Sequence, residues 1–150
     1  MTNPTGLKTF LWYKSDLEGA LEFYKKTFGD VVVKEENRMG PGAPLFTADF
    51  TIYGHEFIGM AIEGGPEFNT SVSLSIQCDG QEETDRLWKA ITAEGEEGQC
   101  GWCKDKWGVS WQITPLQMGD YLGNSNPEIA QHNWQALRNM KKIELSEFKS

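Results

Sequence analysis

The sequence predicts an α+β fold in which two βαβββ modules form cupped mixed sheets, followed by C-terminal helices. Two observations lead to this prediction. Strand-like and helix-like segments occur twice in the same order, and the two helices open at Asp16 and Gln81, which are 65 residues apart. A Gly/Pro-rich break separates the two halves. Such a repeat predicts two similar halves related by a pseudo-twofold axis, with helices on the outer faces of the sheets.

The first module, at about residues 5–63, is expected to begin with a strand and a helix. Leu7–Tyr13 is rich in strand-forming residues. Ser15 or Asp16 can cap the helix that follows, its apolar residues recur at helical spacing, and Gly29 ends it. Alternating apolar and polar residues then predict three strands, at Asp30–Glu36, Leu45–Ile52 and Glu56–Ile62.

The second module, at about residues 70–116, follows the break Glu63–Thr70 and is expected to share one domain with the first. Ser71–Cys78 alternates strictly and predicts a strand, and Gln81–Glu94 has the spacing of an amphipathic helix. Gly98–Pro115 is expected to be a hairpin that ends in the strand Val109–Thr114. A helical tail is expected at 117–150, where a proline suits the first turn of a helix.

The composition excludes several classes of partner. The chain has 150 residues and a formal net charge of −8 at pH 7. Because an acidic surface repels phosphate backbones, no nucleic acid partner is expected. No apolar run is long enough to cross a membrane, and the N-terminus shows no secretory signal. We therefore expect a cytoplasmic protein with no membrane partner.

The motif Cys100-Gly-Trp-Cys103 allows three interpretations: a redox pair, two metal ligands, or two unrelated thiols. A redox pair needs a helix N-terminus to stabilise the thiolate, but the residues after Cys103 predict a turn and a strand. Positions three apart on a strand point to opposite faces, which disfavours chelation of one ion. The pattern therefore favours two unrelated thiols.

Long stretches of the chain carry a family resemblance. The segment TFLWYKSDLEGALEFYKKTFGD resembles the strand–helix opening of the vicinal oxygen chelate superfamily, which includes glyoxalases, bleomycin-resistance proteins and extradiol dioxygenases. The segments FIGMAIEGGPEFNTSVSLSIQC, QEETDRLWKAI and QCGWCKDKWGVSWQITP look like its PhnB-like branch, whose members often carry the label 3-demethylubiquinone-9 3-methyltransferase. The resemblance implies a glyoxalase/bleomycin resistance-like fold and, commonly, a homodimer with its sites in the cups.

The resemblance also bears on cofactors. Enzymes of this superfamily bind a divalent metal through His, Glu or Gln on three strands, and matching the motifs puts Thr9, Ser73 and Gln112 near those positions. Only Gln112 could ligate a metal, because hydroxyl groups are poor ligands for such ions. We therefore expect no catalytic metal. No other cofactor is expected either, because the chain shows no glycine-rich loop for S-adenosylmethionine.

The preferred hypothesis is a protein that binds a small organic molecule in the cup without a metal. A first alternative is a metal-dependent lyase, isomerase or dioxygenase that uses Gln112 and a carboxylate such as Glu56. A second alternative is a thiol redox protein that uses Cys100 and Cys103. The residues expected to contact the ligand combine polar strand residues with aromatic and apolar wall residues: Thr9, Trp12, Tyr13, Phe50, Met60, Ser73, Trp102 and Gln112.

Overall fold

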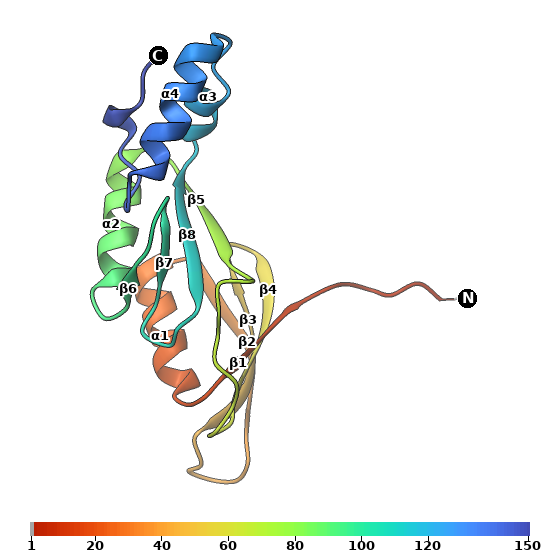
Figure 1. Ribbon diagram of the computed structural model, residues 1–150. Helices are drawn as coiled ribbons and strands as arrows, with labels where there is room; N and C mark the ends of the chain where they lie inside the picture. The colour runs from red at the N-terminus through yellow and green to blue at the C-terminus, as the bar shows by residue number, and fades with distance from the viewer. Residues whose placement is uncertain (1) are drawn as a thin grey trace. The chain divides into compact units, whose positions relative to one another are not determined.

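A computed structural model describes residues 2–150. The chain forms two compact units, and the boundary between them in the sequence lies between Glu67 and Phe68. Each unit contains one four-stranded mixed sheet and a helix that packs on it (Figure 1). This arrangement confirms the predicted α+β class and the repeated order of strands and helices. Among the described residues, no helix has the length and apolar character that a membrane span requires.

The first unit contains one helix and four strands, with the sheet order β1-β4-β3-β2. Strand β1 runs parallel to β4, whereas the other pairs are antiparallel. These elements match the predicted segments to within a few residues: β1 (Thr9–Tyr13), α1 (Leu17–Phe28), β2 (Val31–Arg38), β3 (Leu45–Ile52) and β4 (His55–Ala61).

Helix α1 begins and packs as its sequence indicates. The Asp16 side chain caps it by accepting a hydrogen bond from the Gly19 backbone N–H. Its apolar stripe faces the sheet, where the buried hydroxyl groups of Tyr13 and Tyr24 lie 2.8 Å apart. A Cβ atom at Gly59 on β4 would lie 2.8 Å from a methyl group of Leu17. Glycine at this position therefore allows the helix to approach the sheet closely.

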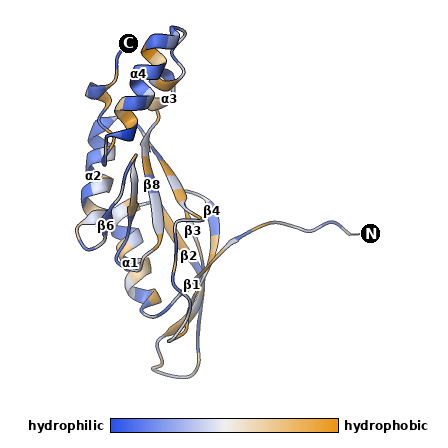
Figure 2. Ribbon diagram, viewed as in Figure 1, coloured by the Kyte–Doolittle hydropathy of each residue, from blue (hydrophilic) through white to orange (hydrophobic). Residues whose placement is uncertain are grey.

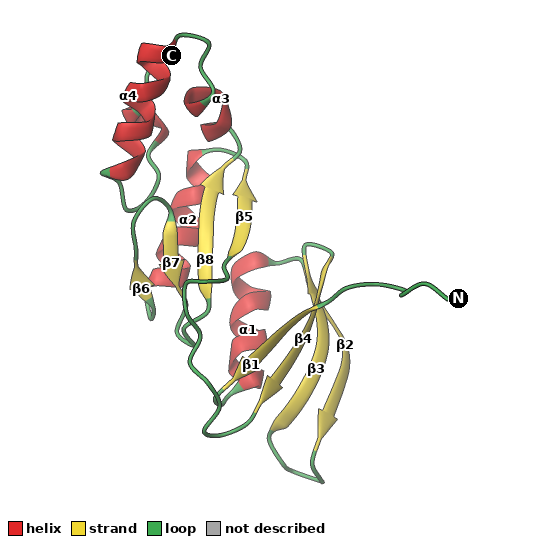
Figure 3. Cartoon of the chain, turned by 45° about the vertical axis from the view of Figure 1, so that its right-hand side comes forward, coloured by secondary structure: helices red, strands yellow, loops and turns green. Residues whose placement is uncertain are grey.

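The second unit repeats this plan, with the sheet order β5-β8-β7-β6 (Figure 3). Strand β5 runs parallel to β8, and the remaining pairs are antiparallel. The expected strand Ser71–Cys78 is shorter in the structure, so Ser73 lies just before it. The elements are β5 (Leu74–Cys78), α2 (Gln81–Thr92), β6 (Glu96–Glu97), β7 (Trp102–Lys104) and β8 (Ser110–Pro115).

A buried carboxylate organises the turn between β7 and β8. One oxygen of Asp105 accepts hydrogen bonds from the backbone N–H groups of Trp107 and Val109, each at 3.0 Å. The other oxygen accepts the indole N–H of Trp111 at 2.9 Å. Asp105 is only 3% exposed. The Asp-Lys-Trp-Gly-Val-Ser-Trp motif therefore builds the hairpin that the sequence predicts.

The C-terminal segment of the second unit contains α3 (Met118–Leu122), α4 (Pro127–Arg138) and a short 3₁₀ helix, η1 (Leu145–Glu147). Helix α4 carries both hydrophilic and hydrophobic residues (Figure 2). The buried side chain of Asn133 donates to the carbonyls of Tyr121 and Lys149 and accepts the Lys149 N–H. The tail helix, which the apolar pattern predicts to reach about Lys142, ends at Arg138. Leu137 of α4 and three residues that follow the helix, Met140, Ile143 and Phe148, form a small apolar cluster.

Candidate functional site

The alternation of side chains along each strand decides which candidate residues are available to a ligand. In each unit one face of the sheet packs against its own helix, α1 or α2. We call the opposite face of each sheet its distal face. Side chains on the helix-covered face belong to the core, so only those on a distal face can contact a ligand there.

In the first unit, three of the five candidates lie on the helix-covered face. Tyr13 and Phe50 are 0% and 1% exposed and belong to the aromatic core. Thr9 shares the face of Tyr13, and its hydroxyl group lies 2.9 Å from the His55 ring nitrogen Nε2. The sequence analysis expected these three residues to line an open cup, but they lie on the face that the helix covers. The sequence pattern did not show which face of β1 and β3 the helix would cover.

The other two candidates of this unit, Trp12 and Met60, lie on the distal face. They are direct partners in the β1–β4 ladder. Phe10 and Ile58 form the neighbouring pair on the same face, and Phe10 is 52% exposed. An apolar surface therefore covers the β1–β4 half of this sheet face.

In the second unit the structure brings all three candidates together. The side-chain amide Nε2 of Gln112 donates to the Ser73 hydroxyl oxygen at 2.9 Å. Trp102 is the direct partner of Gln112 in the β7–β8 ladder, so both side chains project from the distal face. Within the described chain, no hydrogen bond is made to the Gln112 side-chain carbonyl oxygen, which can accept one from a ligand.

A small hollow lies beside Trp102. It has a volume of about 180 Å³ and is lined by Trp102 together with Thr70, Lys104 and Ser110, among others. The sequence analysis did not select these three residues. A signal for two of them exists, because Lys104 follows Trp102 by two positions on β7 and Ser110 precedes Gln112 by two on β8. Thr70 lies in the break before β5 and gives no such signal.

A larger hollow of about 1090 Å³ lies in the first unit, where β1 leads into α1 and the β2–β3 loop approaches. Three of its charged side chains, those of Lys14, Glu18 and Arg38, are held in ion pairs. Arg38 bonds to the Glu18 carboxylate, which also accepts the Leu45 N–H, and these bonds hold the pKa of Glu18 below its usual value. Lys14 is bonded to Glu67. We therefore place the candidate site on the distal face of the second sheet, where polar groups remain available.

The residues at the superfamily's metal positions do not form a suitable donor set. The Ser73 hydroxyl is bonded to Gln112, and the Thr9 hydroxyl is bonded to His55 on the helix-covered face. One amide oxygen remains, whereas divalent metals in such sites prefer imidazole and carboxylate ligands. Glu56, the other proposed ligand, belongs to the first unit and lies 3.5 Å from Lys34. In residues 2–150, no three His, Cys, Asp or Glu side chains cluster as a metal site would require.

The cysteine pair does not resemble a redox centre. Cys103 lies on the helix-covered face, where burial and then the charge of Asp105 raise its pKa to about 12. Burial also raises the pKa of the Cys78 thiol. Cys100 precedes β7 with a φ of 59°, and its backbone N–H donates to the Met140 carbonyl. Because the thiolate is the reactive form, Cys103 is a poor nucleophile at neutral pH.

Residues 5–114 match the family model described as 3-demethylubiquinone-9 3-methyltransferase. The chain belongs to this PhnB-like family. The match ends on β8, so the C-terminal segment with α3, α4 and η1 lies outside it. None of the curated protein sequences compared with the chain matches it.

Solved structures agree with the family. A PhnB protein from Bacillus cereus, described as a 3-demethylubiquinone-9 3-methyltransferase, is 28% identical; the match covers 73% of this chain and 98% of that one, with a TM-score of 0.64. Protein PA1353 from Pseudomonas aeruginosa is 17% identical over 73% and 98% of the two chains, with a TM-score of 0.61.

A third solved structure is the fosfomycin resistance protein FosX from Listeria monocytogenes. It is 19% identical over 80% of this chain and 98% of its own, with a TM-score of 0.60. At this identity, and at that of PA1353, the likeness is one of fold. The three structures together support the glyoxalase/bleomycin resistance-like fold expected from the sequence motifs.

The raised thiol pKa values lead to a labelling prediction. At about pH 8 iodoacetamide should alkylate Cys100 and leave Cys78 and Cys103 unmodified, because alkylation requires the thiolate. Mass spectrometry of the digested protein measures the modification of each residue. All three should react in denaturant, which serves as the control. Alkylation of Cys103 in the folded protein as fast as that of Cys100 would restore the redox hypothesis.

Proposed function

We propose that the protein binds a small organic molecule on the distal face of the β5–β8 sheet, without a catalytic metal. The observation that supports this proposal most directly is the group formed by Ser73, Trp102 and Gln112. An aromatic side chain and an amide with a free acceptor lie next to each other on a strand pair that is fixed by hydrogen bonds.

The chemistry of this group indicates the class of ligand. The face of an indole ring packs well against planar or apolar groups, so Trp102 suits an aromatic or unsaturated portion of a ligand. The Gln112 carbonyl oxygen suits a hydroxyl or N–H donor. The hollow of about 180 Å³ beside Trp102 is smaller than a typical ligand pocket of roughly 300–1,000 Å³. The ligand therefore extends over the sheet face or is enclosed with the help of a second copy of the chain.

We also propose that the protein is a homodimer. The apolar pairs Phe10–Ile58 and Trp12–Met60 on the distal face of the first sheet support this proposal, because exposed apolar surface of this kind often marks an interface. Sedimentation equilibrium should give twice the chain mass of 16.9 kDa. Replacement of Trp12 by Lys should lower the measured mass to that of one chain. A wild-type mass of one chain at high protein concentration would contradict the dimer.

The ligand proposal is tested by a thermal-shift screen of small aromatic molecules that carry hydrogen-bond donors, followed by titration of the hits. Gln112→Leu keeps the size of the side chain but removes the acceptor. A typical hydrogen bond contributes about 1 kcal/mol, so we expect the Kd to rise about fivefold. Trp102→Ala removes the stacking surface and should have a larger effect.

Gln131→Leu on α4 is the matched control, because Gln131 is exposed and lies outside the site. It should leave the affinity unchanged. A flat response of the wild-type protein over the whole library would contradict the proposal, as would hits whose affinity is the same in Gln112→Leu. Stoichiometric divalent metal in protein purified without chelators would contradict its metal-free part and favour the metal-dependent enzyme.

A further inference from the structure

The C-terminal segment Met140–Leu145 lies outside the family match and connects α2 to the candidate site. The family match ends at residue 114. The segment is thus additional to the part that the family model describes. Its contacts lie within the second unit and fall into two groups. One group is with α2, and the other is with Cys100 and Gly101, which form the bend before β7.

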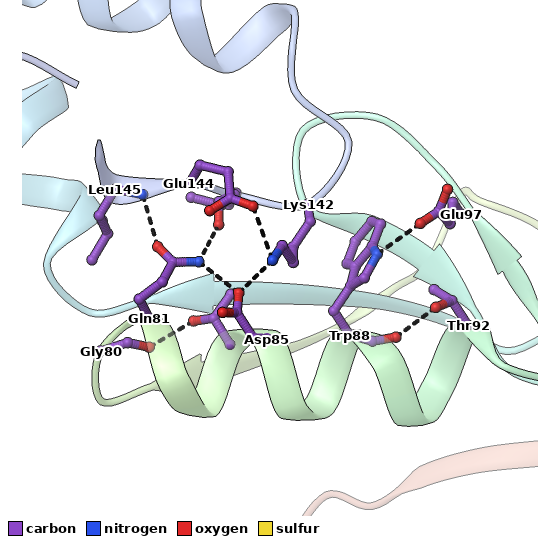
Figure 4. Close-up of polar contacts among 11 residues, drawn as sticks. Gly80, Gln81, Asp85, Trp88, Thr92, Glu97, Lys142, Glu144 and Leu145 are labelled. Atoms are coloured by element: carbon purple, nitrogen blue, oxygen red, sulfur yellow. Dashed lines mark hydrogen bonds and ion pairs between the residues drawn. The ribbon is translucent and has the colours of Figure 1, made fainter. Parts of the chain in front are cut away.

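The contact with α2 is made mainly by one side-chain amide. Gln81, the first residue of α2, donates from Nε2 to the Ile143 carbonyl and accepts the Leu145 N–H at Oε1, each at 2.8 Å (Figure 4). The amide therefore bonds the segment as a neighbouring strand would. Beside it, the Lys142 ammonium group bonds to both Asp85 and Glu144 (Figure 4).

The contact with the bend is made by backbone groups. The Cys100 N–H donates to the Met140 carbonyl and the Gly101 N–H donates to the Lys141 carbonyl, each at 2.8 Å. The buried Ile143 side chain packs directly on Gly101. A Cβ atom at position 101 would lie 2.7 Å from Ile143 Cδ1, and φ is +85° there. The bend thus requires glycine, and the segment covers it tightly.

The same bend leads directly into Trp102. The Gly101 carbonyl accepts the Ile113 N–H of β8 at 2.8 Å, so the bend is held between the C-terminal segment on one side and β8 on the other. Trp102 is the next residue, and Gln112 immediately precedes Ile113. The bend is therefore adjacent in sequence to Trp102 and bonded to the residue that follows Gln112.

We propose that Met140–Leu145 is a clasp that fixes the bend and holds Trp102 opposite Gln112, with Gln81 as the positioning residue that anchors the clasp. The consequence for ligand affinity rests on the function proposed above. The clasp itself is a property of the free protein and can be measured without a ligand.

The test compares Gln81→Ala with the wild-type full chain by amide hydrogen exchange. Loss of two hydrogen bonds of about 1 kcal/mol each should speed exchange at Cys100 and Gly101 by about tenfold or more. The indole N–H resonance of Trp102 should shift, whereas that of Trp12 in the first unit should not. Gln81→Glu retains the acceptor for Leu145 but replaces the donor to Ile143 and Asp85 by a carboxylate oxygen, so it should exchange as fast as Gln81→Ala or faster. Gln131→Ala on the exposed face of α4 is the control and should change neither measurement.

Two results would overturn the proposal. Unchanged exchange at Cys100 and Gly101 in Gln81→Ala would show that the clasp does not hold the bend. Faster exchange with an unmoved Trp102 resonance would show that the bend does not position the ring. With a hit from the ligand screen, Gln81→Ala should also raise the Kd several-fold. Failure to find any ligand would contradict the proposed function. The exchange measurement would still show whether Met140–Leu145 fixes the bend.

Discussion

The hydrogen bonds of the buried Asp105 carboxylate are the interaction on which the second unit depends. They join the backbone of the turn to the Trp111 indole of the following strand. Because an unpaired buried charge costs several kcal/mol, alternative turns that leave this carboxylate without donors are strongly disfavoured. The turn therefore fixes the register of β7 on β8, and this register places Trp102 opposite Gln112.

The motif around Asp105 thus has a structural role. The candidate site consists of neighbouring residues whose side chains lie on the opposite, distal face of the sheet. Trp111 and Gln112 are adjacent in sequence but project from opposite faces of β8: Trp111 is 1% exposed in the core and Gln112 lies on the distal face. The family match over residues 5–114 supports the fold. The ligand depends instead on the residues that project from the distal face, and fold by itself does not determine them.

The sequence predicted the elements well because periodicity is a local property. Among its eight candidate ligand residues are Ser73, Trp102 and Gln112, which the structure brings together on one sheet face. It did not predict that Tyr13 and Phe50 belong to the core, because alternation divides a strand into two faces without showing which one a helix covers. It could not reveal the clasp either. Gln81 binds the backbone at Ile143 and Leu145, more than 60 residues away, and a backbone partner leaves no pattern in the sequence.

The most direct test of this account is the unfolding of Asp105→Asn in urea, with Asp120→Asn on the exposed surface of α3 as the control. The amide keeps one acceptor but turns an N–H₂ group toward the Trp111 indole N–H, so two donors face each other. We predict that the free energy of unfolding falls by about 3 kcal/mol and that the backbone resonances of Trp102 and Gln112 shift. A variant within about 0.5 kcal/mol of the wild type, with both resonances unmoved, would contradict the account.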